Sequence, residues 1–353
     1  MAEGPRRRRW LLLGVLLALV LAVVLPRVRL PAPQDVVWVE EAGEPIRWPK
    51  GAPHASDHSL AASDQLKVGV YATNISNINL LDDQFSIELL LWTFWEGAPD
   101  RNPSDQLRLL NGIYDGDIQR FQRVRQEQRP QGLWTLYRVR SAVVKRWHLQ
   151  RYPFDDQVLL LQFGLEDPLE PVRLNVVEDQ PFVISPGLLL PGWRLKEESA
   201  YASSLSLMSD LGIPPATGLT VRRQPTVSFT LPIQRRSLLF VAPDFLGYML
   251  AVGLCCMSLM ITRSRDDLIL AAVVSAGGNY VFIAGKLPVT AMTGFIGNLQ
   301  LIVFLGILYV VAADEIIDHH LRSYSKPVSN VLKVVLLPSY LAITFLGIAL
   351  IIP

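Results

Sequence analysis

One apolar segment near the C-terminal end of the chain combines an acid with a face of small side chains. The segment spans Leu268–Gly285 and is directly preceded by Asp267. On a helix with 100° between successive residues, this acid shares one narrow face with small and medium-sized residues. That face consists of Asp267, Ala271, Val274, Gly278, Val281, Gly285 and, at its edge, Phe282. A carboxylate in this position can attract cations, which is the chemistry that the segment offers.

Two interpretations of this face are open. Small residues let neighbouring helices approach closely, and Asp267 would then simply reach cytosolic water from the helix end. Alternatively, identical copies surround an axis, the small face lines a water path, and Asp267 forms a ring of carboxylates at its mouth. An acid within a span costs about 2.5–3.5 kcal/mol on insertion scales, so it faces water or a partner. Such a ring would favour cations.

Three further apolar segments accompany this one and must position it. The four are Phe245–Ile261, Leu268–Gly285, Phe295–Ala313 and Val334–Pro353. Each is near the ~20 residues that a helix needs to cross ~30 Å of hydrocarbon. Basic residues concentrate in the first-to-second and third-to-fourth links, which the positive-inside rule places in the cytosol. Residues 237–353 are therefore predicted to form a four-helix transmembrane domain.

Residues 67–236 have the pattern of short β-strands separated by turn residues. The absence of a long amphipathic helix from this region predicts an antiparallel, immunoglobulin-like β-sandwich. Both cysteines, Cys255 and Cys256, lie outside it, so the domain must fold by core burial alone. The candidate strands are Val68–Asn74, Phe85–Trp95, Trp134–Arg140, Val158–Phe163, Val172–Val177, Trp193–Ala202 and Val221–Leu231.

The N-terminal residues 1–26 join the basic Arg6–Arg9 to the apolar run Trp10–Leu25. This pattern predicts a cleaved export signal or, as the alternative, a retained anchor. In both cases the basic end stays in the cytosol and the following segment is exported. Residues 27–66, rich in Pro, Ala and Ser, are predicted to be a linker. We therefore expect a multi-pass protein of a cell (inner) membrane, with its β-rich domain extracellular or periplasmic.

Composition and motifs exclude several functional classes. The 353 residues include 33 Lys and Arg and 32 Asp and Glu, a formal net charge of +1, so nucleic acid is not an expected partner. The exported domain has no phosphate loop or nucleophile motif, and no enzyme, cofactor or metal is expected. An alternative is an intramembrane metal-dependent enzyme built on Glu315, His319 and His320, although a solvated helix end explains these residues more simply.

Several motifs resemble the pentameric ligand-gated ion channels, in particular the prokaryotic proton- or amine-gated members. The strongest is Arg151–Gln157, with the sequence Arg-Tyr-Pro-Phe-Asp-Asp-Gln, which is similar to the family's Pro-Phe-Asp loop between two strands. Val68–Tyr71 and Leu91–Trp95 resemble the first two strands. Leu287–Thr290 resembles the outer second-to-third linker, and Glu315–Leu321 the end of the third helix. The resemblance covers residues 67–353.

The resemblance implies a homopentamer in a lipid bilayer, with the second helix of each copy lining a cation-selective pore. Counted back from Pro288, Arg265 would be the basic residue at the inner end of that helix. Asp267 would form the selectivity constriction and Val274 the hydrophobic gate. The alternative is a non-conducting membrane sensor or scaffold of the same architecture.

The resemblance also implies how the two domains couple. A charged pair would form at their junction, and the first strand-to-strand loop would press on the second-to-third linker. A routine interfacial salt bridge, worth about 0–1 kcal/mol if exposed, is the alternative interpretation of the pair. The residues implied are Asp155 and Arg236 as the pair, Pro153 and Phe154 in the loop, Asp82 and Asp83 in the strand loop, and Leu287 and Pro288 in the linker.

The stimulus is expected to be an unknown small ligand or protons. The chain lacks the loop cysteines of the non-prokaryotic members, and Gly97–Gln131 is short and lacks the family's Trp-x-Pro-Asp/Glu signature. By the resemblance, Glu166 and Asp167 lie where one ligand-binding loop is expected, and Tyr201 lies at the start of a second ligand-binding loop. Carboxylates and an aromatic ring would suit an amine, whereas strand packing is the other interpretation of Tyr201.

Overall fold

The computed structural model describes residues 64–113, 120–130, 132–167, 172–207, 211, 222–237, 241–261, 264–320 and 326–352. These residues belong to two compact units. Among the described residues, a helical unit contains His148–Asp155 and the chain from Ser237 onward, and a β unit contains the chain from Asp64 to Trp147 together with Asp156–Arg236. The signal or anchor predicted at 1–26, and the linker predicted at 27–66 except for its last residues, lie outside the described residues.

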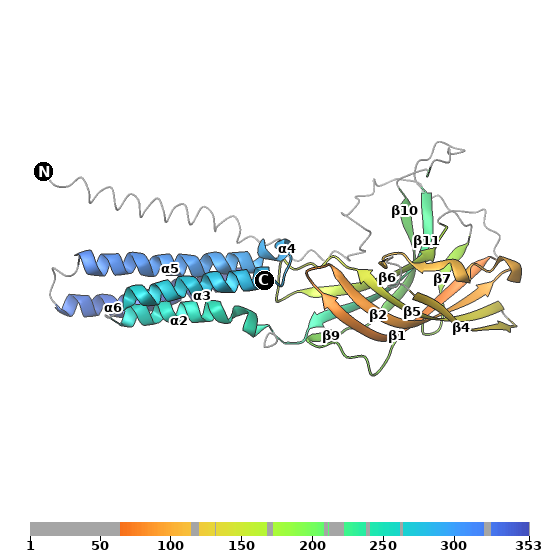
Figure 1. Cartoon of the computed structure of the whole chain (residues 1–353), viewed down its shortest axis with the longest axis horizontal. Helices are drawn as coiled ribbons and strands as arrows, with labels where there is room; N and C mark the ends of the chain where they lie inside the picture. Colours follow the sequence, from red (N-terminus) through yellow and green to blue (C-terminus); the bar gives the residue numbers. More distant parts are fainter. Residues whose placement is uncertain are drawn as a thin grey trace. The chain divides into compact units, whose positions relative to one another are not determined.

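The β unit consists of two sheets (Figure 1). In the six-stranded sheet the order is β4-β5-β2-β1-β7, and β8 also pairs with β1. In the five-stranded sheet the order is β10-β11-β6-β3, and β9 also pairs with β11. The first sheet contains β1 (Gln65–Asn79), β2 (Gln84–Glu96), β4 (Arg120–Arg129), β5 (Gly132–Val144), β7 (Arg173–Val176) and β8 (Phe182–Ile184). The second contains β3 (Leu107–Leu109), β6 (Asp156–Leu165), β9 (Trp193–Leu195), β10 (Ser199–Leu207) and β11 (Arg222–Arg235).

An apolar core explains why these residues form strands. Along β2, buried and half-buried side chains alternate from Phe85 to Trp95, because successive side chains of a strand point to opposite faces. The rings of Phe182 in one sheet and Phe229 in the other lie 5.6 Å apart, edge to face, so the two sheets share this core. Burial of these side chains stabilises the unit at about 25 cal/mol per Å² of apolar surface.

The prediction of an antiparallel sandwich is correct for most strand pairs but wrong for one edge of the first sheet. There β7 and β8 both run parallel to β1. The prediction also missed β4, because its residues are mostly polar and exposed and its two apolar residues, Phe121 and Val124, give no alternating pattern. The predicted strand Trp193–Ala202 is divided into β9 and β10.

The helical unit contains α2 (Leu246–Met260), α3 (Arg265–Ala284), the short α4 (Val289–Met292), α5 (Phe295–His320) and α6 (Lys326–Ile351). A 3-10 turn, Ala242–Phe245, leads into α2. Three helices are long and apolar enough to cross a membrane, over Ala242–Met260, Arg265–Ala284 and Phe295–Glu315, which indicates a membrane protein. The apolar part described in α6 is shorter, Val335–Ile351, so the fourth crossing stays a prediction.

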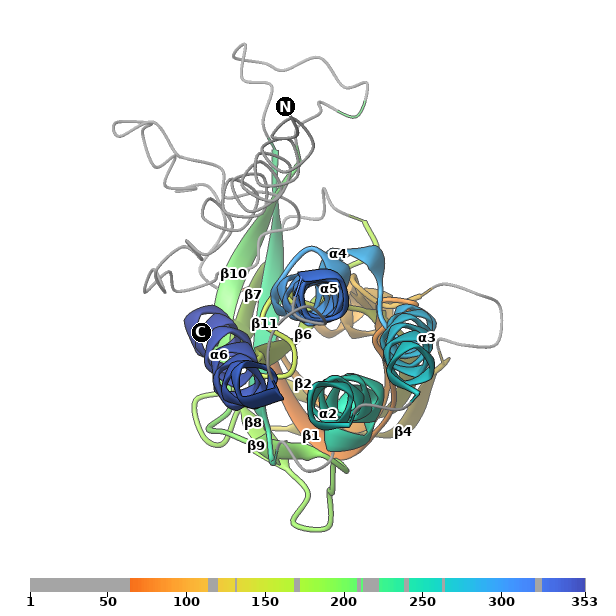
Figure 2. The same cartoon turned by 90° about the vertical axis from the view of Figure 1, so that its left-hand side faces the viewer.

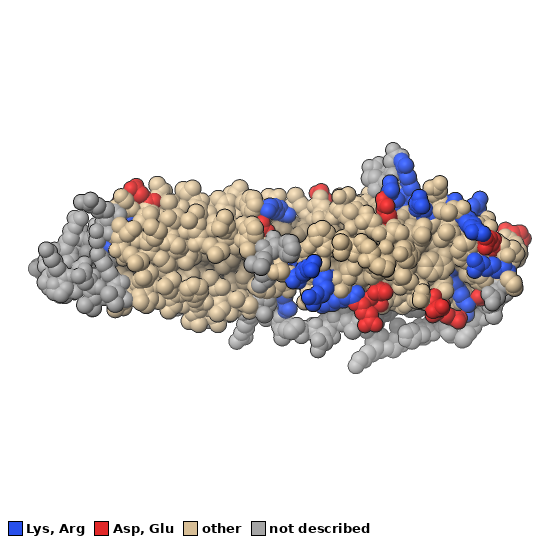
Figure 3. Space-filling model, turned by 90° about the horizontal axis from the view of Figure 1, so that it is seen from below, with Lys and Arg blue, Asp and Glu red and all other residues tan. Residues whose placement is uncertain are grey.

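Helices α3 and α6 occupy opposite corners of the unit, and each contacts both α2 and α5 (Figure 2). Close approach of α5 and α6 depends on Gly306, where a Cβ would lie 3.1 Å from the ring of Tyr340. Tyr340 stacks on Tyr309, whose hydroxyl lies 2.6 Å from that of Ser339. On the face shown in Figure 3, charged side chains of the helical unit gather near the helix ends, as expected for helices that cross a hydrocarbon layer.

The strand β5 begins at a glycine that no other residue can replace without strain. Gly132 has φ of +144°, and a Cβ there would overlap the carbonyl oxygen of Trp95. We expect Gly132→Ala to destabilise the β unit by about 1–3 kcal/mol, seen as a lower unfolding midpoint by tryptophan fluorescence. Gly187→Ala is the matched control, since a Cβ there has only Ser185 Oγ within 4 Å, at 3.9 Å. Equal midpoints for the two variants would contradict this account of the strand.

Candidate functional site

The face of α3 predicted from the sequence is exposed in the single chain. Asp267, Ala271, Val274, Gly278, Val281, Phe282 and Gly285 are all exposed. Val274 and Val281 keep 65% and 69% of their surface. The exposed arc is wider than the predicted stripe, because the bulkier Leu270, Val273 and Tyr280 are exposed as well. A large apolar surface on α3 is therefore left uncovered by the helices that the structure describes.

The opposite face of α3 is held by Asn279. Its amide oxygen accepts from the Gly247 N–H at 2.9 Å, and its amide nitrogen donates to the Asp244 carbonyl at 3.0 Å. Ser275 donates to the Gly247 carbonyl at 2.9 Å. The Gly247 N–H, which lies in the first turn of α2 and has no partner within its own helix, is satisfied in this way. These bonds fix the rotation of α3 and therefore decide which of its faces is exposed.

Of the cations at the ends of α3, the structure describes Arg265 and Lys286, and each is paired with an acid from another element. Arg265 donates from Nη1 to Asp314 Oδ1 at 2.6 Å and from Nε to the Ile261 carbonyl at 2.7 Å. At the other end, Lys286 Nζ lies 2.8 Å from Asp244 Oδ1 and 4.0 Å from the centre of the Phe282 ring. The positive charges are thus neutralised locally.

The acids of α3 are arranged differently. Asp266 and Asp267 lie in its first turn and are exposed. Neither has an ion-pair partner within the part of the chain that the structure describes. The helix N-terminus favours negative charge, which makes this end a suitable place for carboxylates. The uncompensated charge on the exposed face of α3 is therefore negative.

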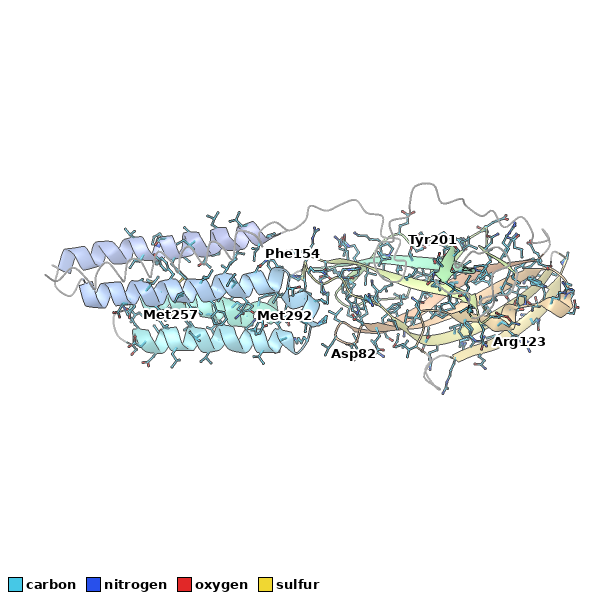
Figure 4. All side chains as sticks on the ribbon, turned by 90° about the horizontal axis from the view of Figure 1, so that it is seen from above. Asp82, Arg123, Phe154, Tyr201, Met257 and Met292 are labelled. Carbon is cyan, nitrogen blue, oxygen red and sulfur yellow. The ribbon has the colours of Figure 1, made fainter. Side chains whose placement is uncertain are left out.

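The predicted Pro-Phe-Asp loop packs within the helical unit. The Phe295 N–H donates to the Gln150 carbonyl at 2.8 Å, and the rings of Phe154 and Phe295 meet edge to face at 5.3 Å. Pro153 is buried, and the peptide bond before it is cis. Figure 4 labels Phe154 and Met292 at the same end of the unit, and Met257 toward the opposite end. The loop is thus seated where α4 and α5 begin.

Asp244, just before α2, joins the Pro-Phe-Asp loop to α3 and to the residue Lys286 that follows it. Asp244 accepts from the Tyr152 hydroxyl at its Oδ2, at 2.7 Å, and from Lys286 at its Oδ1. Its backbone carbonyl accepts from Asn279 of α3. We call Asp244, Tyr152, Lys286 and Asn279 the Asp244 network. The sequence analysis included Tyr152 only as part of the Arg151–Gln157 motif and did not connect it with Asp244, although opposite charges at the ends of two neighbouring spans were a usable signal.

The predicted coupling residues are divided between the two units. Asp155, Leu287 and Pro288 belong to the helical unit, whereas Asp82, Asp83 and Arg236 belong to the β unit. Asp155 and Leu287 are buried, and Arg236 is exposed. The Asp155–Arg236 pair and the contact of the strand loop with the linker therefore stay predictions.

Within the β unit, the strand loop is fixed to the segment after β5. The Asp83 carbonyl accepts from the Lys145 N–H at 2.7 Å, and the Trp147 indole donates to the Asn79 carbonyl at 2.9 Å. Asp82 is exposed and accepts from Asn79 at 2.7 Å. Figure 4 labels Asp82 at one end of the β unit and Arg123 at the other. Movement of the strand loop would therefore be passed directly to the segment that precedes His148.

The predicted ligand residues lie on different strands of the second sheet. Glu166 follows β6, is exposed and pairs with Arg108 at 2.8 Å, and Asp167 is exposed beside it. Tyr201 lies in β10 opposite Ser228 of β11, and its burial raises the pKa of its phenol. The described part of the chain has no group of three or more His, Cys, Asp or Glu arranged to hold a metal. The side chains of His319 and His320 lie outside the described residues.

The contact between the Pro-Phe-Asp loop and the start of α5 can be tested directly. A Cβ at Gly294 would overlap the carbonyl oxygen of Gln150. We expect Gly294→Ala to displace the loop and to make exchange of the Phe295 amide hydrogen about 5–30-fold faster, the effect of losing one or two kcal/mol. The measurement is hydrogen exchange by mass spectrometry. Gly277→Ala, where a Cβ has nothing within 4 Å, is the control; unchanged exchange in Gly294→Ala would show that the loop is not seated there.

When the chain is compared with protein-family models and with curated proteins, no family model and no curated protein matches it.

Proposed function

We propose that copies of this chain form a ligand- or proton-gated, cation-selective channel in a cell membrane, as a homopentamer with α3 of each copy lining the pore. The observation that carries the proposal is the charge arrangement of α3. Its exposed face ends in acids without ion-pair partners in the described chain, while the two described cations at its ends, Arg265 and Lys286, are paired with acids outside α3. The number of copies follows from the resemblance of the loop and linker motifs to pentameric channels.

Membrane energetics favour a water-facing α3. Only 22% of the apolar segment of α3 is buried inside the chain, compared with 28% for the segment that contains α2 and 44% for α5. An ionised acid costs about 2.5–3.5 kcal/mol at the centre of a span, so Asp267, near the end of α3, is favoured where it reaches water rather than lipid. A shared axis places the acid in water and brings the apolar Val274 and Val281 of several copies together. Rings of apolar side chains close a pore by dewetting and open it when they move apart.

The Asp244 network offers a route from stimulus to pore. A stimulus acting on the β unit would move the loop between β5 and β6, which contains Tyr152. Tyr152 and Lys286 share the Asp244 carboxylate, so displacement of the loop alters the support at one end of α3. The stimulus shifts the population toward the open state only to the extent that it favours that state energetically.

The remaining parts of the proposal concern topology. Helix α6 makes the fourth crossing, the β unit is exported, and the α2–α3 link with the Asp267 end faces the cytosol. Such a multi-pass arrangement agrees with the basic residues of the two inner links.

Water access to α3 can be tested with introduced cysteines. In a background without Cys255 and Cys256, we expect Val274→Cys and Val281→Cys to react with a membrane-impermeant thiol reagent in liposomes, because thiols react as hydrated thiolates. Two controls should stay unreacted: Ala276→Cys, buried within the chain, and Leu346→Cys, which is 63% exposed on α6 and expected to face lipid. Reaction limited to Leu346→Cys would contradict the proposal.

Charge selectivity can be tested with Asp267→Asn. We expect this variant to lower the cation-to-anion permeability ratio in planar bilayers about tenfold, because it removes a ring of charges close to the ion path. Asp266→Asn removes the same charge one residue away, about 100° around the helix, and should have a smaller effect. Currents would be recorded over a range of pH and with small amines. Silence under all conditions from intact oligomers would favour a non-conducting sensor or scaffold.

A further inference from the structure

We propose that Asp314 is a selectivity-determining residue of this channel, because it withdraws the charge of Arg265 from the ion path. The inference rests on the proposed function. Arg265 is the first residue of α3 and stands directly before Asp266 and Asp267. Its guanidinium lies 2.6 Å from Asp314 on α5, with side-chain exposures of 9% and 19%. The basic residue at this end of α3 therefore faces a neighbouring helix rather than the exposed side.

The consequence for charge is simple. If Arg265 were exposed, the first turn of α3 would present one cation and two acids, a net charge of −1 in each copy. With Arg265 paired to Asp314, the two exposed acids act alone and present −2. Five copies around an axis multiply this difference. Asp314 thus makes the electrostatic potential at this end of the path more negative, although it belongs to α5 and not to α3.

Local physics explains why Arg265 needs this counter-ion. The positive end of the helix dipole disfavours a cation in the first turn of a helix. A guanidinium stays charged at any ordinary pH, so it cannot escape burial by losing a proton. Its Nε also donates to the Ile261 carbonyl at the end of α2, so the pair joins α2, α3 and α5. Without Asp314, the least costly response is for Arg265 to turn into nearby water.

The test is the permeability ratio of Asp314→Asn in planar bilayers. Coulomb's law for five unit charges at about 10 Å in water, reduced by physiological salt, predicts a fall of about threefold or more. The double variant Arg265→Gln with Asp314→Asn should regain the wild-type ratio, since it removes the released cation. A purely structural role for Asp314 would not give this rescue. Glu315→Gln removes an exposed acid from the next position of α5 and should leave the ratio unchanged.

The permeability measurements distinguish failure of the Asp314 inference from failure of the proposed channel function. If Asp314→Asn keeps the wild-type ratio while Asp267→Asn lowers it, the inference is wrong and the proposed function stands. No current from the wild-type protein under any condition would overturn both. If Asp314→Asn does not assemble, the exchange of Arg265→Asp with Asp314→Arg re-forms the ion pair in reverse. The inference is supported if this exchange variant assembles and its cation preference is at least as strong as that of the wild type. It is rejected if the variant does not assemble, or if it assembles with a weaker cation preference.

Discussion

A charge on a helix that crosses a membrane must be paired or hydrated, and the described cations and acids of α3 meet this requirement in different ways. Arg265 and Lys286 are paired with acids outside α3, whereas Asp266 and Asp267 are exposed without a counter-ion in the described chain. Pairing fixes the cations to α5 and to the start of α2. The acids need water instead, and in the proposed channel a path shared by several copies would supply it.

The same pairing that neutralises Lys286 also connects α3 to the Pro-Phe-Asp loop. Asp244 bonds to Tyr152 and Lys286 through its carboxylate and to Asn279 through its backbone. A half-buried carboxylate of this kind is costly when it loses a partner, so its neighbours tend to move with it. Asp244 therefore both pairs with the charge of Lys286 and links the loop to α3. Gly294 contributes by allowing the backbone of the loop to approach α5 closely.

The periodicity of apolar residues predicted many of the strands and helices, but it does not show which residues distant in sequence pair with one another. Alternating apolar residues located β2, and the exposed face of α3 followed from the wheel because small residues and an acid recur on it. Strand β4 gave no signal, since its residues are mostly polar and exposed, and the parallel pairing of β7 with β1 depends on contacts distant in sequence. The Arg265–Asp314 pair was missed for the same reason, because the residues lie 49 positions apart. Motif resemblance directed attention to Asp155 and Arg236, and the hydrogen bond between Tyr152 and Asp244, which lie 92 positions apart, was missed as well.

The central claim is that α3 helices from several identical chains surround a hydrated passage. Electron cryo-microscopy of the detergent-purified complex measures the copy number and the innermost helix together. The account predicts five chains around one axis, with α3 nearest to it and the carboxylates of Asp267 directed at the passage. A monomer or dimer, or a ring in which another helix is innermost and α3 faces detergent, would contradict it.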